Sequence, residues 1–118
     1  MKLMKSSKDS AKSDTLTLIL AVLVSAPNHG YGIARAIEGL SEELFQVGEG
    51  ALYPALRTLE NAGFIVGAWE VQGSGPARKT YTITDLGLKE HERRTQEWEN
   101  FKRAMDKILR GNPGVQMA

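Results

Sequence analysis

The stretch GEGALYPALRTLENAGFI, residues 48–65, predicts a helix whose two faces differ in chemistry. At about 100° per residue, one side gathers the apolar side chains Leu52, Ala55, Leu56 and Leu59. The opposite side is polar or carries short side chains, namely Gly50, Pro54, Arg57 and Asn61, with Tyr53 and Thr58 on the flanks. Proline is tolerated near a helix N-terminus and Gly63 suits a left-handed C-terminal cap, so we expect this helix to span residues 50–62.

The N-terminal residues predict a polar arm followed by a buried helix. Residues 1–13 are rich in serine and lysine, have a net charge of +3 and lack hydrophobic periodicity, which predicts a flexible basic arm. This arm either binds DNA phosphates or is a solubilising leader. The apolar run at residues 16–24 resembles a secretory signal but is too short to span a bilayer. It is better explained as a first helix over residues 14–25, capped by Ser13 or Asp14.

Two further elements complete the domain around the amphipathic helix. After a turn at residues 27–30, a second helix is expected over residues 31–44, either continuous or broken near residues 39–41. Two segments rich in β-forming residues, 64–71 and 78–84, flank a stretch of glycine, serine and proline, which predicts a hairpin. Three short helices followed by a hairpin are typical of a winged helix-turn-helix domain, here an α+β fold that is mostly α.

The composition excludes several classes of chemistry. The 118 residues suit one small globular domain. There is no cysteine, and His29 and His91 are isolated, so we expect no disulfide, no metal site and no catalytic residue. The glycine-rich segments at residues 48–50 and 73–75 lack the lysine and the strand-to-helix context of a phosphate-binding loop. We therefore expect neither an enzyme nor a cofactor, and we expect Trp69 to pack hydrophobically in its strand.

The distribution of charge matters more than the total of +1. Residues 14–63 hold two basic and six acidic side chains, a net charge of −4. Arg35 and Arg57 stand alone in this acidic segment and are the first candidates to bind an anion.

A winged helix places its third helix in the major groove of double-stranded DNA, and two copies of the chain would read the two halves of an inverted repeat. The short side chains at the start of that helix would let a phosphate approach its N–H groups. The candidate DNA-binding residues are Gly50, Ala51, Tyr53, Pro54, Arg57, Thr58, Asn61, Arg78 and Lys79. For Tyr53 the alternative is that its ring packs over the second helix.

The last helix, expected over residues 85–110, carries an apolar stripe that its own chain does not cover. The stripe consists of Trp98, Phe101, Met105 and Ile108. A second copy of the chain would cover it, with Leu16, Leu20 and Leu23 of the first helix completing a dimer interface. Residues 111–118 are expected to be a disordered tail, and residues 14–84 the DNA-binding domain.

Three motifs carry a resemblance to the PadR family of bacterial transcriptional repressors. They are GxGALYPALRxLExxGFI from residue 48, GxxRKxYxITDxG from residue 75 and HGYGI from residue 29. With one helix after the hairpin, the chain is similar to the short, LmrR-like subfamily. The family commonly has three basic residues in the hairpin, whereas PARK at residues 76–79 provides two.

The resemblance implies a cytoplasmic homodimer that represses transcription from a promoter palindrome and is released or remodelled by a small molecule. The candidate effector is a small aromatic or phenolic compound. In LmrR-like members an aromatic-lined pore lies at the dimer interface, and its tryptophan corresponds to Trp98. Trp98, Phe101 and Met105 are therefore candidate ligand-binding residues, and for Trp98 the alternative is packing in the interface alone. A different class of function, a dimeric winged-helix adaptor that contacts only proteins, also fits the residues. No membrane partner is expected.

Overall fold

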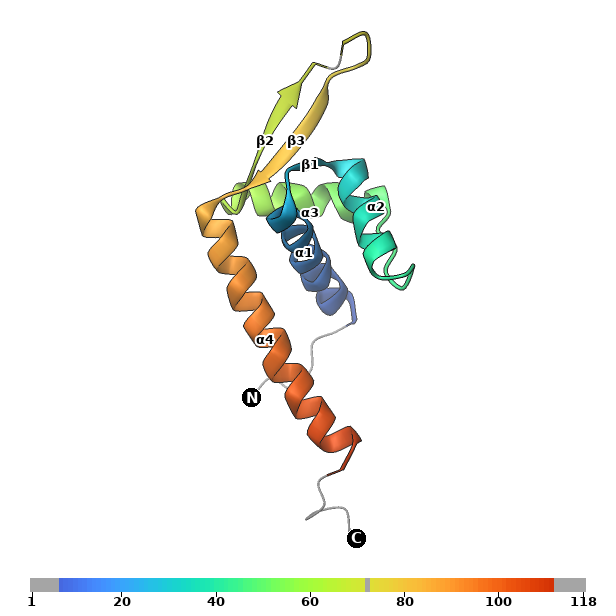
Figure 1. The fold of residues 1–118 in the computed structure, drawn as a ribbon, viewed down its shortest axis with the longest axis vertical. Helices are drawn as coiled ribbons and strands as arrows, with labels where there is room; N and C mark the ends of the chain where they lie inside the picture. Colours follow the sequence, from blue (N-terminus) through green and yellow to red (C-terminus); the bar gives the residue numbers. More distant parts are fainter. Residues whose placement is uncertain (1–6, 72, 112–118) are drawn as a thin grey trace.

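The computed structural model describes residues 7–71 and 73–111, and of residues 7–11 it describes the backbone alone. The elements follow in the order α1 (Ser7–Ser25), β1 (Asn28–His29), α2 (Gly30–Leu40), α3 (Glu49–Asn61), β2 (Ile65–Glu70), β3 (Arg78–Ile83) and α4 (Asp85–Leu109). The β2–β3 hairpin projects from one end of the helical body, and α4 runs toward the other (Figure 1). Helices with a small antiparallel sheet confirm the expected winged helix-turn-helix fold.

α1 begins at Ser7, which corrects the helix start expected at residue 14 and brings part of the expected arm into the helix. No glycine or proline occurs between Ser7 and residue 14, so nothing there breaks the helix. Ser13, one of the two expected caps, lies inside the helix, and its carbonyl accepts a hydrogen bond from the Thr17 hydroxyl at 3.0 Å. The rest of the arm, residues 1–6, and most of the expected tail, residues 112–118, lie outside the described residues.

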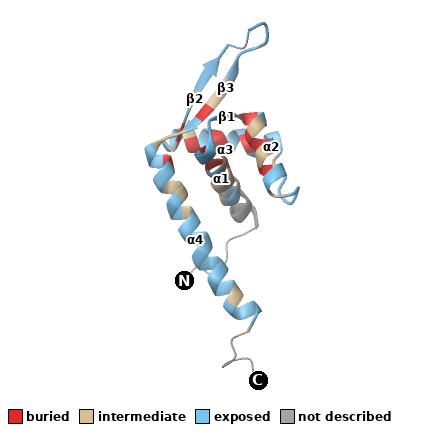
Figure 2. Ribbon diagram, in the orientation of Figure 1, coloured by how far each residue is buried: buried red, intermediate tan, exposed pale blue. Residues whose placement is uncertain are grey.

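One cluster of buried side chains joins the first three helices to the sheet (Figure 2). Its members are Ile19, Leu20 and Leu23 in α1, Ile33, Ala34 and Ile37 in α2, Leu52, Ala55, Leu56 and Leu59 in α3, and Ile65 and Tyr81 in the strands. The apolar face expected for the amphipathic helix is thus confirmed.

The cluster also corrects part of the expected dimer interface. Leu20 and Leu23 are 0% and 2% exposed within one chain. The core of that chain already surrounds both side chains, so they cannot contact a second copy. Leu16 is partly buried against the same core.

The second helix takes the broken form of the two alternatives. α2 ends at Leu40, and the left-handed φ values of Glu42 and Glu43, 52° and 69°, turn the chain away from the helix axis. The segment at residues 27–30, expected to be only a turn, contains β1, which pairs antiparallel with β3.

β3 is the middle strand of the sheet order β1-β3-β2. In the hairpin, Gly67 lies opposite Tyr81 and Trp69 lies opposite Lys79. Ile65 at the base of β2 is buried, whereas Trp69 is 69% exposed. The hydrophobic packing expected for Trp69 is therefore wrong, because the outer half of β2, residues 68–70, is exposed to solvent.

α4 starts in tight contact with the turn between α3 and β2. The Thr84 hydroxyl caps α4 by accepting a hydrogen bond from the Gly87 N–H at 3.0 Å. A Cβ atom at Gly87 would overlap the carbonyl oxygen of Phe64, so the contact requires glycine. Within the described ranges, no helix combines the length and the apolar composition needed to cross a membrane.

Arg94 ties the first half of α4 to α1. Its guanidinium donates to the Thr17 hydroxyl at 2.9 Å, to the Ser13 carbonyl at 3.2 Å and to the Glu90 carboxylate at 2.7 Å. Hydrogen bonds from Arg93, and then from Arg94, lower the pKa of Glu90 to about 2. We call the contacts of Arg94 with α1 the clamp. Beyond this clamp α4 has mainly exposed side chains (Figure 2).

Candidate nucleic-acid interface

The outward face of α3 is open to a partner along its whole length. All seven residues assigned to DNA binding on this helix are exposed, namely Gly50, Ala51, Tyr53, Pro54, Arg57, Thr58 and Asn61. Arg57 forms neither a hydrogen bond nor an ion pair with any other described residue. Arg57 lies on the exposed side of a helix whose opposite face is buried. Its guanidinium can therefore contact phosphates or base edges without first breaking a bond to another described residue.

The two basic residues of the hairpin have different environments. Arg78 is exposed. Lys79 is held inside the chain, because its Nζ lies 3.1 Å from Oε1 of Glu60 on α3 and 5.4 Å from the centre of the Tyr81 ring. Of the two, Arg78 is thus the one free to contact a phosphate.

Glu60 was not among the residues singled out from the sequence, although it joins α3 to the hairpin. Its second oxygen, Oε2, accepts a hydrogen bond from the Gly67 N–H at 3.2 Å. Both Glu60 and Lys79 stand in the quoted motifs, but they are separated by 19 residues and no spacing rule links them. The bridge therefore ties both strands of the hairpin to α3.

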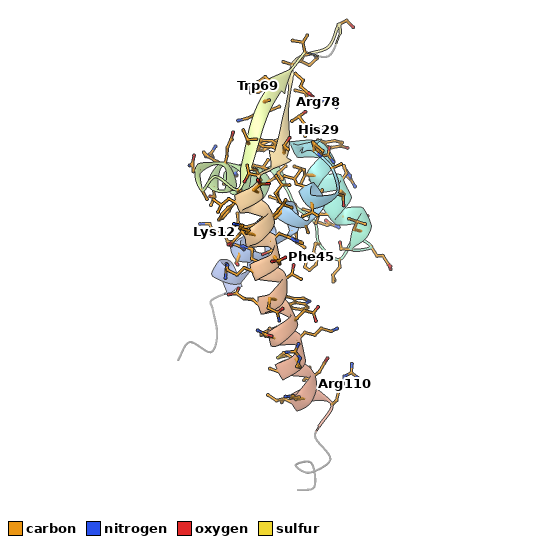
Figure 3. All side chains as sticks on the ribbon, turned by 60° about the vertical axis from the view of Figure 1, so that its left-hand side comes forward. Lys12, His29, Phe45, Trp69, Arg78 and Arg110 are labelled. Carbon is orange, nitrogen blue, oxygen red and sulfur yellow. The ribbon has the colours of Figure 1, made fainter. Side chains whose placement is uncertain are left out.

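A cleft of about 530 Å³ lies between the hairpin, the start of α2 and α3. It is lined by His29, Gly30, Tyr31, Tyr53, Trp69, Ala77, Arg78, Lys79 and Tyr81. Figure 3 shows Trp69 and Arg78 on the hairpin and His29 near them, at the same end of the molecule. We call this the aromatic cleft, and it brings together Tyr53, Arg78 and Lys79, three of the residues expected to bind DNA.

Both alternatives for Tyr53 remain compatible with its position in the cleft. Its ring lies against the start of α2, since a Cβ atom on Gly30 would be 3.0 Å from the Tyr53 hydroxyl oxygen. Tyr53 is nevertheless 44% exposed, so part of it is open to a partner.

His29 has a structural role that the sequence did not indicate. It is the N-cap of α2, and its Nδ1 accepts a hydrogen bond from the Gly32 N–H at 3.1 Å. The HGYGI motif thus caps α2 and presents Tyr31, which is 66% exposed, at the rim of the cleft.

Tyr81 forms the floor of the cleft. Burial of its ring raises the pKa of the phenol, although the positive charge of Lys79 acts in the opposite direction. The phenol therefore stays protonated at neutral pH and can donate a hydrogen bond.

The apolar stripe on α4, residues 98–108, follows the cleft residues in the sequence and is exposed, as expected. Trp98 and Phe101 are 55% and 56% exposed, with their ring centres 5.8 Å apart. Met105 and Ile108 continue the stripe and are also exposed. In a single chain these residues form an open surface, so a ligand site built on them requires a second copy.

Several solved structures are similar to this chain. A transcriptional regulator from Clostridium thermocellum is 30% identical, with a TM-score of 0.78 over 86% of this chain and 98% of that chain. A PadR family transcription regulator from Clostridium difficile is 31% identical, with a TM-score of 0.70 over 80% and 97% of the two chains. Bacillus subtilis PadR, solved in complex with operator DNA, is 28% identical, with a TM-score of 0.60 over 65% of this chain and 44% of that chain.

The match to the transcriptional regulator PadR-like family extends over residues 19–93, which include α3, the hairpin and the first turns of α4. Its members are regulators of transcription, which confirms the expectation that the chain is not an enzyme. On the fold, the motifs and this match, the chain belongs to the PadR-like family of transcriptional regulators.

Proposed function

We propose that this PadR-like regulator is a repressor that binds an inverted-repeat operator as a homodimer. The observation that carries the proposal is the exposed face of α3, where Arg57 forms no ion pair with any described residue, together with the exposed Arg78 on the adjoining hairpin. Bacillus subtilis PadR has been solved on operator DNA, which supports the same use of the fold here. In this role the protein acts in the cytoplasm, where the promoter is.

The stripe on α4 supports the dimer. Trp98, Phe101, Met105 and Ile108 expose large apolar surfaces along a helix whose first half is already fixed on α1 by Arg94. If a second chain packs its own α4 along this stripe, the stripe of each chain is covered by the stripe of the other. Two-fold symmetry requires such an identical contact on both sides. Two recognition helices held in this way would read half-sites about one turn of DNA apart, roughly 34 Å.

The same interface would hold the effector. Two copies of Trp98 facing each other across the two-fold axis would form apolar walls, and a flat aromatic or phenolic compound could stack between them. Such a compound releases DNA only if it binds the DNA-competent dimer less well than another arrangement of the two chains. Loss of compound binding in Trp98→Ala, with the dimer retained, is the expected result of a fluorescence titration.

Footprinting on DNA upstream of the protein's own gene and its neighbours tests the proposal. We expect a protected inverted repeat and an affinity for that duplex that falls steeply with salt concentration. An adaptor that contacts only proteins would give no saturable specific binding to any duplex, and that result would contradict the proposal.

A further inference from the structure

The aromatic cleft offers hydrogen-bond donors that carry no charge. They are the hydroxyls of Tyr31, Tyr53 and Tyr81 and the indole N–H of Trp69. None of these four groups forms a hydrogen bond with another residue in the part of the chain that the structure describes. Trp69 and Tyr31 are among the most exposed aromatic side chains of the protein, so their donors are open to a partner.

The cleft contains little free positive charge. Of the two cationic side chains in its lining, Lys79 is paired with Glu60. Arg78 is exposed and forms no ion pair with any described residue. Among the described residues, no carboxylate lines the cleft. An anion that enters would therefore meet several neutral donors and one unpaired cation.

Tyr53 connects the cleft to the recognition helix. It belongs to the outward face of α3 and also lies against Gly30 at the start of α2. In helix-turn-helix proteins, the helix before the recognition helix crosses the DNA backbone while the recognition helix occupies the major groove. A duplex seated on α3 would thus carry its sugar–phosphate backbone past the start of α2 and the inner side of the hairpin.

We propose that the aromatic cleft binds the phosphodiester backbone of the operator, with the phenol and indole groups as donors and Arg78 as its charged contact. The inference rests on the DNA-binding function proposed above. It extends the protein's DNA-facing surface to residues 29–31 and to Trp69. Charged contacts release counterions from DNA and make affinity depend on salt, whereas neutral donors fix the position of a phosphate without that release. The contribution of the neutral donors to affinity is therefore largely independent of salt, and within the cleft only Arg78 adds to the salt dependence.

The test measures operator affinity at several salt concentrations for three variants. Tyr31→Phe combined with Tyr53→Phe keeps both rings and removes two hydroxyls, and Arg78→Gln removes the charge. Thr82→Val is the matched control, because it removes an exposed hydroxyl of β3 that does not line the cleft.

We expect the double tyrosine variant to bind about tenfold more weakly than the parent with an unchanged salt slope. Arg78→Gln should bind more weakly and reduce the slope by about 0.9. The control should bind like the parent. Operator should also change tryptophan emission, and Trp69→Phe should remove that change.

One result would overturn the inference while leaving DNA binding by α3 intact, namely full operator affinity in the double tyrosine variant. If benzoate, a planar anion, then changes the emission of Trp69, the cleft is a small-anion site instead. Failure of the parent protein to bind any duplex is a distinct result, and it would overturn the proposed function itself.

Discussion

Replacing Glu60 should loosen the hairpin from the recognition helix. The carboxylate accepts a hydrogen bond from the Gly67 N–H at 3.2 Å and pairs with the Lys79 ammonium at 3.1 Å. The side chains of the ion pair are 29% and 31% exposed, so solvent weakens their attraction, and we assign the pair about 0.5 kcal/mol. A charge-assisted hydrogen bond to a backbone N–H contributes about 1.5 kcal/mol more. Glu60→Ala should therefore lower the free energy of unfolding by about 2 kcal/mol.

Denaturant unfolding at one fixed protein concentration measures this loss. Glu92→Ala is the matched control, since Glu92 is an exposed carboxylate on α4, and its removal should change the free energy of unfolding by less than about 0.5 kcal/mol. A double-mutant cycle with Lys79→Met should return a coupling of about 0.5 kcal/mol between Glu60 and Lys79. Equal losses for Glu60→Ala and Glu92→Ala would refute the bridge as a support of the hairpin.

The same bridge predicts unequal roles for the two basic residues of the hairpin. Because Glu60 holds Lys79, Lys79→Met should change the salt slope of operator binding less than Arg78→Met does. Gel-shift titrations at three salt concentrations provide the slopes. If both variants reduce the slope equally, Lys79 exchanges Glu60 for a phosphate in the complex. The proposed difference in role between Lys79 and Arg78 would then be wrong.

Four further outcomes are expected. Arg57→Ala should fold normally and weaken operator binding by about 1 to 3 kcal/mol in a gel shift, and unchanged affinity would remove it from the interface. Gly87→Ala should lower the free energy of unfolding by about 3 kcal/mol in denaturant titration, because its Cβ would overlap the carbonyl oxygen of Phe64; a native midpoint would contradict this. Since the pKa of Glu90 is lowered to about 2, the carboxylate stabilises the fold fully above about pH 4.5, and this stabilisation is lost as the pH falls toward 2. Thermal melts between these pH values should therefore show a flatter pH dependence for Glu90→Gln than for the parent, and equal pH dependence of the two proteins would refute this reasoning. Truncation after Arg94 keeps the clamp on α1 and removes the stripe, so sedimentation should show monomers or aggregates, and an intact dimer would rule out the stripe as the interface.

Local signals in the sequence were sufficient for most of the fold. The apolar positions of α3 recur at helical spacing, and Gly63, which adopts φ +83° directly after the helix, is the left-handed cap that its position indicated. Thr84, the residue directly before the helix expected from residue 85, caps α4. These features depend on neighbours within a few residues, which is why the sequence alone places the helix boundaries of α3 and α4 to within one residue.

The positions that the sequence placed wrongly depend on contacts between distant elements. The second half of α1, residues 16–24, is apolar nearly all round, and its sequence does not say which side meets its own chain, so Leu20 and Leu23 could not be separated from a dimer surface. Trp69 lies in a β-forming segment, but how far a hairpin extends past the helices is a property of the assembled domain. Glu60 and Lys79 meet only because α3 and the hairpin fold against each other.

The pairing of Lys79 with Glu60 also bears on how such a regulator would find its site. Non-specific binding to DNA is almost entirely electrostatic, and it weakens as fewer phosphates are neutralised. Here the segment 14–63 is acidic on balance, and the hairpin offers Arg78 while Lys79 serves to hold the hairpin in place. A domain of this kind gives up part of its general attraction to DNA and keeps a fixed geometry between α3 and the hairpin. On the two proposals made above, its preference for an operator over other DNA would come from base contacts by α3 and from the shape of the backbone in the aromatic cleft. Substitutions at these two places should therefore alter specificity most.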